Sequence, residues 1–257
     1  MPKAISDVKI YGHRGAKKIA PENTIPAFEK TLEMGADGFE LDTMLSADGI
    51  PVVIHDRSLS RTTNGNGYVD QKTISELKNL DAGGWFSEKY CDVRIPLLSD
   101  VLKTFGKKAQ INIELKNFTH PFNSLPDKVY DLVCEECLLE NILFSSFIPF
   151  NLVRIRKKNP NARVALLFKP DLPGKLFATS IFQSISPDYI HPHFSSCSSS
   201  FINKQHLMGR RINTWTVNDE EVIRELIEHG IDGIISDDPG LAVQIRKQVF
   251  DSFNNVL

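Results

Sequence analysis

The chain has 257 residues, of which 41% are hydrophobic and 24% charged, and a formal net charge of −2 at pH 7. These values are typical of a globular protein, and the near-neutral charge argues against a nucleic-acid partner. No segment approaches the ~20 apolar residues of a membrane span, and residues 1–9 lack the apolar stretch of a secretion signal. We therefore expect a cytoplasmic protein without a membrane span; the sequence does not indicate an oligomeric state.

Strand-like apolar runs alternate with helical patterns along the whole chain. The strand candidates are residues 8–11, 38–42, 111–115, 142–147, 164–168, 189–193, 212–217 and 233–236. Helical patterns follow most of them, at residues 24–34, 127–139, 149–158, 176–185, 201–208, 219–229 and 239–253. Strands separated by helices, in a chain close to the ~250 residues of a (β/α)8 barrel, predict an α/β fold, a TIM barrel formed by residues 1–257 as a single domain.

The first group of polar residues directly follows the first strand candidate. His13 places a titratable imidazole beside the permanent cation of Arg14, where a strand leads into a helix. Asn23 or Thr24 is expected to cap that helix. A cation close to the start of a helix is a suitable place for an anion.

Two carboxylates lie two residues apart in the second strand candidate. Because side chains alternate along a strand, Glu40 and Asp42 point to the same face. Asp48-Gly49 is typical of a two-residue hairpin turn, which pairs this strand with the β-rich run that ends at His55. In that register His55 lies opposite Asp42.

The β-rich run, residues 51–55, follows its predecessor too closely for a crossover, so we expect a hairpin arm above the barrel mouth. Residues 57–96 are rich in turn residues and are predicted to form an insertion after the second barrel strand. A helical pattern over residues 98–105 returns the chain to the third barrel strand. In that strand Glu114 and Lys116 again share one face.

The carboxylates of Glu40, Asp42 and Glu114 are most simply explained by a bound metal ion. Each ionised carboxylate that is removed from water costs several kcal/mol, so several of them together need a cation. Carboxylate oxygens are hard ligands, which favour Mg²⁺, Ca²⁺ or Mn²⁺ over a structural zinc. Cys134 and Cys137 have a metal-like spacing but lie in a helical pattern, so we expect them to be buried or half-buried free thiols.

The candidate residues come from different strands but share one end of the predicted barrel. His13, Asp42, Glu114 and Trp215 fall at or near the carboxyl ends of strand candidates, where the active sites of such barrels lie. The residues alone leave two other classes open: a metal-assisted isomerase or enolate-forming lyase with a lysine base, and a non-catalytic barrel that binds a ligand. The presence of the histidines and of all the carboxylates argues against the non-catalytic class.

Six short motifs occur in order along the chain. They are His13-Arg14-Gly15, Pro21-Glu22-Asn23-Thr24, Glu40-Leu41-Asp42, His55-Asp56, Glu114-Leu115-Lys116 and Trp215-Thr216-Val217-Asn218. With these motifs the chain resembles the glycerophosphodiester phosphodiesterase family from about residue 11 to residue 238. The resemblance implies a barrel with a small inserted segment, and a metal-dependent hydrolysis of glycerophosphodiesters to glycerol 3-phosphate and an alcohol.

The resemblance also implies a role for each candidate residue. The implied roles are acid and base for His13 and His55, metal ligands for Glu40, Asp42 and Glu114, phosphate contacts for Arg14 and Lys116, and part of the substrate wall for Trp215. The chemistry agrees, because a phosphodiester gains negative charge in its transition state and needs one proton removed and another supplied. Which histidine is the acid stays open, as does the nucleophile, which is water or a neighbouring hydroxyl of the substrate.

Glycerophosphodiesters of small polar alcohols are the expected substrates. The sequence shows no evident acyl-binding stripe and no amphipathic membrane segment outside the core. The main alternative is a phospholipase D-like hydrolysis of lysophospholipids, and the two substrates differ in the size and apolar character of the mouth that they require.

Overall fold

Eight parallel strands close into a barrel in the computed structural model, which describes residues 7–170, 185 and 187–254. The barrel strands are β1 (Lys9–His13), β2 (Gly38–Leu45), β4 (Gln110–Leu115), β5 (Ile142–Ser146), β6 (Val164–Phe168), β7 (Tyr189–Pro192), β8 (Arg211–Thr214) and β9 (Gly233–Ser236). Each strand pairs with the next one along the chain, and β1 pairs with both β2 and β9. The predicted (β/α)8 barrel is confirmed.

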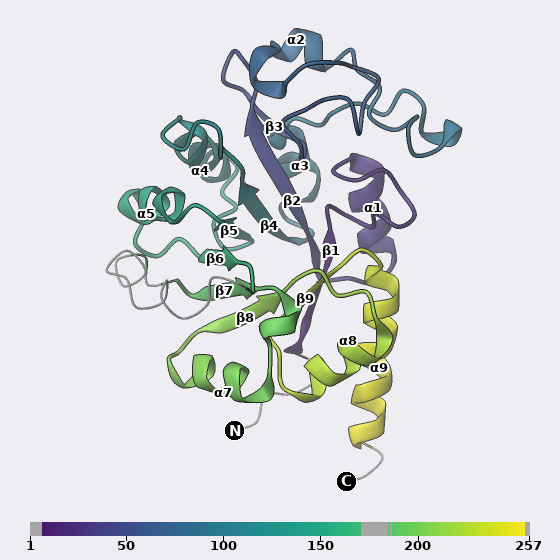
Figure 1. Ribbon diagram of the computed structural model, residues 1–257, viewed down its shortest axis with the longest axis vertical. Coiled ribbons are helices and arrows are strands. Elements are labelled where there is room, and N and C mark those ends of the chain that lie inside the picture. The colour runs from purple at the N-terminus through teal and green to yellow at the C-terminus, as the bar shows by residue number, and fades with distance from the viewer. Residues whose placement is uncertain (1–6, 171–184, 186, 255–257) are drawn as a thin grey trace.

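Helices surround the strands on the outside of the barrel (Figure 1). They are α1 (Ile25–Glu33), α3 (Leu98–Phe105), α4 (Leu125–Glu135), α5 (Pro149–Lys158), α7 (Ser199–Leu207), α8 (Glu220–Glu228) and α9 (Pro239–Asn254). The helix expected over residues 176–185 falls outside the described residues, apart from its last position. Within the part of the chain that the structure describes, a helix with the length and apolar character of a membrane span is not found.

One helix is shorter than its sequence pattern. The sequence predicts a helix over residues 127–139, but α4 ends at Glu135. Cys137 has a φ of 57°, and this left-handed conformation ends the helical path. Cys137 therefore lies outside the helix. Both cysteines are free thiols, as the sequence predicts, and Cys134 is half-buried, but Cys137 is exposed because the chain has left the helix there, so the expected burial of Cys137 is wrong.

The apolar side of the barrel strands packs against the helices. Phe39 of β2 stacks on Phe28 of α1 at 4.2 Å between ring centroids, and both rings meet Phe105 of α3 edge-on at 5.5 and 6.1 Å. All three side chains are buried. Aromatic packing of this kind adds to the hydrophobic stabilisation and fixes β2, the strand that carries two of the candidate metal ligands.

The hairpin after β2 differs by one residue from the predicted register. Strand β3 (Pro51–Val53) pairs antiparallel with β2, and Thr43 lies opposite Val53. The turn has three residues rather than two, because Gly49 adopts a φ of 76° and Ser46 pairs with Ile50. The predicted pairing of His55 with Asp42 is therefore wrong.

The backbone nevertheless keeps His55 close to the barrel. The amide of Ile54 donates a hydrogen bond to the carbonyl oxygen of Asp42 at 3.0 Å. This bond continues the hairpin contact for one residue beyond β3. His55 therefore reaches the mouth of the barrel from the hairpin arm, although it does not share a ladder pair with Asp42.

The segment between β3 and α3 lies at the carboxyl end of β2, beside the barrel mouth (Figure 1). Its short helices are η2 (Val69–Gln71), α2 (Ile74–Leu77) and η3 (Glu88–Tyr90). Leu59, Val69 and Leu77 of this segment are buried together with Val52 of β3 in a small apolar cluster separate from the main core. The inserted segment therefore has packing of its own, and its edge faces the site.

A close approach between β2 and β4 makes Gly38 sensitive to substitution. A Cβ at this position would lie 1.8 Å from the carbonyl oxygen of Gln110. We expect Gly38→Ala to lower the free energy of unfolding by about 1–3 kcal/mol, as overpacking does. Gly240→Ala is the control. A Cβ at this position would lie 3.3 Å from its nearest neighbour, and alanine favours the helix. Urea unfolding measures the stability of the two variants. Equal stabilities would contradict a close approach of β2 to β4 at Gly38.

Candidate active site

Three carboxylates from two neighbouring strands converge at the barrel mouth. Glu40 and Asp42 come from β2 and Glu114 comes from β4, where Asp42 and Glu114 are register partners. One oxygen of each lies within 4.8 Å of the others, and all three residues are buried. The structure thus brings together the three residues that the sequence predicts as metal ligands.

The three carboxylates differ in their electrostatic environment. Burial raises the pKa of Glu40 well above its usual value, and the nearby charges of Asp42 and Glu114 raise it further. Burial also raises the pKa of Glu114, to about 7, against the opposing effect of Lys116. Burial acts on Asp42 too, but Lys116 and Arg14 outweigh it and hold the pKa of that carboxyl below its usual value.

Two cations flank the carboxylates. Lys116 Nζ lies 3.3 Å from Asp42 Oδ1 and 3.5 Å from Glu114 Oε1. Arg14 Nε lies 3.3 Å from Asp42 Oδ2, and the Arg14 backbone amide donates to Glu40 Oε2 at 3.0 Å. Arg14 has a φ of 55°, so the chain turns sharply just after β1 and aims this amide at the carboxylate. Both cations that the sequence predicts at the site therefore lie beside the carboxylate cluster, where their charge is directed toward the barrel mouth.

Asn23 orients Asp42 instead of capping helix α1. Its side-chain amide donates to Asp42 Oδ2 at 2.8 Å and accepts from the Asp42 backbone amide at 3.2 Å. Thr24 stands at the cap position of α1, but its hydroxyl donates to the carbonyl oxygen of Pro21 at 2.6 Å and caps nothing. The predicted side-chain cap is therefore wrong, because the buried carboxylate and the turn use both polar side chains.

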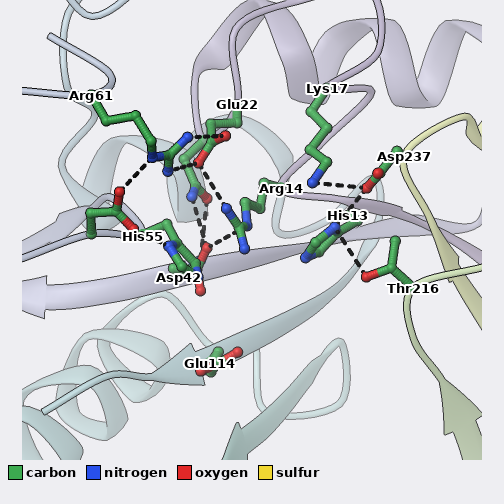
Figure 2. A network of polar contacts seen from close by, with 12 residues as sticks. His13, Arg14, Lys17, Glu22, Asp42, His55, Arg61, Glu114, Thr216 and Asp237 are labelled. Carbon is green, nitrogen blue, oxygen red and sulfur yellow. Dashed lines mark hydrogen bonds and ion pairs between the residues drawn. The ribbon is translucent and has the colours of Figure 1, made fainter. Parts of the chain in front are cut away.

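His13 is held by a carboxylate from the far end of the chain. His13 Nδ1 lies 2.7 Å from Asp237 Oδ1, and Asp237 also contacts Lys17 Nζ at 3.1 Å (Figure 2). The side-chain amide of Asn218 donates to the other oxygen of Asp237 at 2.9 Å. Burial lowers the pKa of His13 although Asp237 accepts a hydrogen bond from the ring. Asp237 is not among the site residues that the sequence predicts. Its position directly after a barrel strand is a signal that would have marked it as a candidate.

His55 has an equivalent partner next to it in the chain. His55 Nδ1 lies 2.5 Å from Asp56 Oδ1. Burial lowers the pKa of His55, and this outweighs the opposite effect of Asp42. A carboxylate at Nδ1 fixes the orientation and tautomer of an imidazole. Both histidines are thus anchored through Nδ1, and both line the cavity at the barrel mouth.

A chain of charged contacts connects His55 to Arg14. Arg61 Nε contacts Asp56 Oδ2, and its two terminal nitrogens donate to the Glu22 carboxylate at 2.9 and 2.7 Å. Glu22 Oε1 in turn accepts from Arg14 Nη1 at 2.9 Å. Figure 2 shows this series of ion pairs. Arg61 belongs to the turn-rich inserted segment, where no sequence periodicity or motif distinguishes it from the neighbouring arginines.

A cavity of about 230 Å³ lies at the barrel mouth. Its lining includes His13, Arg14, Glu40, Glu114, Lys116 and Trp215. Trp215 forms one wall, where its ring meets Phe147 edge-on at 5.5 Å and its indole N–H donates to the carbonyl oxygen of His191 at 2.7 Å. Asn112 also lines the cavity, and its buried side-chain amide has no hydrogen-bond partner among the described residues. The cavity therefore offers both an apolar wall and unused polar atoms to a ligand.

The residues present fit a divalent metal ion. Three buried carboxylates within reach of one point form a hard oxygen site. Within the described part of the chain, the buried Glu114 Oε1 makes no hydrogen bond, and its one charged partner is Lys116 Nζ at 3.5 Å. A cation at this point would give Glu114 a closer partner and would offset the repulsion between Glu40, Asp42 and Glu114.

A barrel that gathers carboxylates, cations and anchored histidines at its carboxyl end has the design of a metal-assisted hydrolase of anionic esters. The model of the "Glycerophosphoryl diester phosphodiesterase family" matches residues 13–241, and the chain belongs to this family.

Individual proteins of the family are similar over nearly their whole length. A glycerophosphodiester phosphodiesterase from Caldanaerobacter subterraneus is 35% identical over 93% of this chain and 98% of its own. The crystal structure of a glycerophosphodiester phosphodiesterase from Agrobacterium tumefaciens has a TM-score of 0.81 at 31% identity, covering 92% of this chain and 99% of that chain.

A phosphodiesterase from Oleispira antarctica, solved in complex with the product sn-glycerol-3-phosphate, has a TM-score of 0.84 at 28% identity. The similarity covers 95% of this chain and 100% of that chain.

Arg61→Met tests the connection between the inserted segment and His55. Without the guanidinium, the negative charge of Asp56 acts on His55 unopposed, so the pKa of His55 should rise. NMR titration of the histidine ring protons measures this shift. Arg94→Met is the matched control, because Arg94 lies in the same segment and pairs with the exposed Asp92 at 3.0 Å. An unchanged titration of His55 in Arg61→Met would contradict the connection.

Proposed function

We propose that this protein hydrolyses glycerophosphodiesters to glycerol 3-phosphate and an alcohol with the help of a divalent cation. The observation that carries the proposal is the position of the three buried carboxylates between Arg14 and Lys116, with two carboxylate-anchored histidines beside them. Membership of the phosphodiesterase family supports the reaction class. The product complex of the Oleispira antarctica relative supports glycerol 3-phosphate as the product.

The proposed metal ligands are Glu40, Asp42 and Glu114. Their oxygens favour Mg²⁺ or Ca²⁺, with Mn²⁺ as a further candidate. When bound, such an ion polarises a phosphoryl oxygen and neutralises developing negative charge. Asn23 keeps Asp42 oriented through two hydrogen bonds, so the ligand does not need to reorganise when the ion arrives.

The balance of charge favours an anionic substrate. Three carboxylates and a divalent ion leave one net negative charge, and Arg14 and Lys116 turn this into one net positive charge. The phosphodiester brings one negative charge and gains more as phosphorus is attacked. Charge-assisted hydrogen bonds from Arg14 and Lys116 therefore strengthen toward the transition state, which is the requirement for catalysis.

His13 and His55 are the proposed acid and base. Each uses Nδ1 for a carboxylate, so each presents Nε2 to the cavity that both side chains line. The departing alkoxide needs a proton and the attacking oxygen must lose one, so two imidazoles divide the work. Trp215 provides an apolar wall for the carbon atoms of the substrate and limits the space in which the diester can rotate.

A specific observation also supports lysophospholipids as a second class of substrate. Exposed aromatic rings follow β4 and β5 at the mouth: Phe118, Phe122 and Phe150 are 55%, 78% and 41% exposed. Phe118 contacts Phe147 at 6.2 Å, and Phe147 meets Trp215 in the cavity wall. An apolar path of this kind suits an acyl chain, and comparing the turnover of lysophosphatidylcholine with that of glycerophosphocholine distinguishes the two classes.

Metal removal tests the carboxylate site. Because a ligand that binds only the folded state stabilises it, adding Mg²⁺, Ca²⁺ or Mn²⁺ should raise the Tm of the chelator-treated protein. Glu114→Gln should abolish this shift and most turnover. The metal-free variant should be at least as stable as the metal-free wild type at pH 8, since the substitution removes a buried charge. Full activity after exhaustive chelation would refute the metal assignment.

His13→Ala and His55→Ala should each lower kcat by about 10² to 10⁴, the usual contribution of a positioned acid or base. The double variant should lose less than the product of the two effects, because the residues act in one reaction. Both variants should keep the metal-induced rise in Tm. A 4-nitrophenyl diester, whose leaving group needs no acid, should restore turnover to the variant that lacks the acid. If neither histidine variant regains turnover on this substrate while both still bind metal and substrate, the division into one acid and one base is contradicted.

A further inference from the structure

A second and larger cavity adjoins the first one. It has a volume of about 400 Å³ and lies between the inserted segment and the loop that follows β4. His55 and Lys116 line both cavities. A phosphodiester whose phosphate contacts Lys116 can therefore extend one substituent into each space.

The inserted segment provides an ion pair in the wall of this second cavity. Arg57 Nε donates to both oxygens of Asp70, at 3.1 and 2.9 Å. The guanidinium also lies 4.1 Å from the ring centroid of Tyr68, so its plane is fixed. The two terminal amino groups of Arg57 have no acceptor among the residues that the structure describes. Arg57 thus offers a group of oriented donors to a ligand.

Asp70 supplies the complementary acceptor. Its carboxylate has several lone pairs, and besides Arg57 it meets only His120 Nε2, at 3.4 Å, among the described residues. The lining also includes the apolar side chains of Met44, Leu45 and Phe118. A donor and an acceptor therefore stand side by side in a space bounded by apolar carbon atoms.

We propose that this cavity binds the alcohol part of the phosphodiester and selects polyols such as glycerol or inositol. The inference rests on the proposed function and specifies its substrate. A hydroxyl group can accept from Arg57 and donate to Asp70 at the same time, and a polyol can present several hydroxyls to the pair. The smaller cavity, with Trp215, then holds the glycerol phosphate part.

A choline group does not suit the same wall. It has no hydrogen-bond donor for Asp70, and because Arg57 and Asp70 together are neutral, the pair offers its positive charge no net attraction. Quaternary ammonium groups are bound by aromatic faces. Phe118 is the one aromatic side chain other than histidine in the described lining, and Arg57 covers the ring of Tyr68. The cavity therefore discriminates by hydrogen bonding rather than by size.

The test compares kcat/KM for glycerophosphoglycerol and glycerophosphoinositol with that for glycerophosphocholine, in the presence of saturating metal. The wild type should prefer the polyol diesters. Arg57→Met keeps an unbranched apolar stem but removes the guanidinium and its donors. It should lower kcat/KM for the polyol diesters by about tenfold or more, the usual effect of losing a hydrogen bond to a charged group. Turnover of the choline diester should fall less than threefold or rise.

Asp70→Asn provides a second variant of unchanged size and should also reduce the polyol preference. Arg94 lies in the same inserted segment but does not line the cavity. Arg94→Met should therefore leave kcat/KM unchanged for both the polyol diesters and the choline diester. Equal kcat/KM values of the wild type for polyol and choline diesters would overturn the inference, as would an equal loss on both substrates in Arg57→Met. If the wild type hydrolyses no glycerophosphodiester with any of the metals, the proposed function itself fails, and this result is distinct from the other two.

Discussion

The mutual repulsion of three buried carboxylates is the constraint on which the site depends. Glu40, Asp42 and Glu114 are fixed by the pleat and register of β2 and β4, so they cannot move apart without disturbing the barrel. Lys116, Arg14 and Asn23 hold Asp42 ionised, whereas the pKa values of Glu40 and Glu114 are raised. The fixed positive charges of Arg14 and Lys116 thus lower the pKa of one carboxyl only, and a divalent cation would stabilise the ionised form of the other two. Metal binding at this point would therefore be coupled to the stability of the barrel.

The inserted segment contributes to the site by a different principle. Its small apolar cluster gives it a packed base, from which Arg61 reaches the carboxylates of Asp56 and Glu22. A planar guanidinium can satisfy two carboxylates at once, and this is the reason that one residue can align both His55 and Arg14. The positions of His55 and Arg14 at the barrel mouth therefore depend on a segment that contributes no strand to the barrel.

The sequence predicts the barrel and its candidate metal ligands because both rest on short-range periodicity. The two-residue spacing of Glu40 and Asp42 places them on one face whatever their neighbours are, and parallel strands bring Glu114 to the same end. Arg61 meets Glu22 and Asp56 through the packing of the inserted segment, and Asp237 meets His13 where β9 lies beside β1, so residue spacing does not reveal either contact. The hairpin register fails for a related reason: Gly49 adopts a left-handed conformation, which adds one residue to the turn and shifts His55 relative to Asp42.

The bond between His13 and Asp237 joins residues that are 224 positions apart, and it forms where the last strand of the barrel meets the first. Because a ribosome releases the end of the chain last, His13 emerges early but acquires its partner only when β9 takes its place beside β1. The order of synthesis therefore makes barrel closure and the pairing of His13 with Asp237 a single event. A nascent chain that has not yet closed carries the imidazole without the carboxylate that orients it.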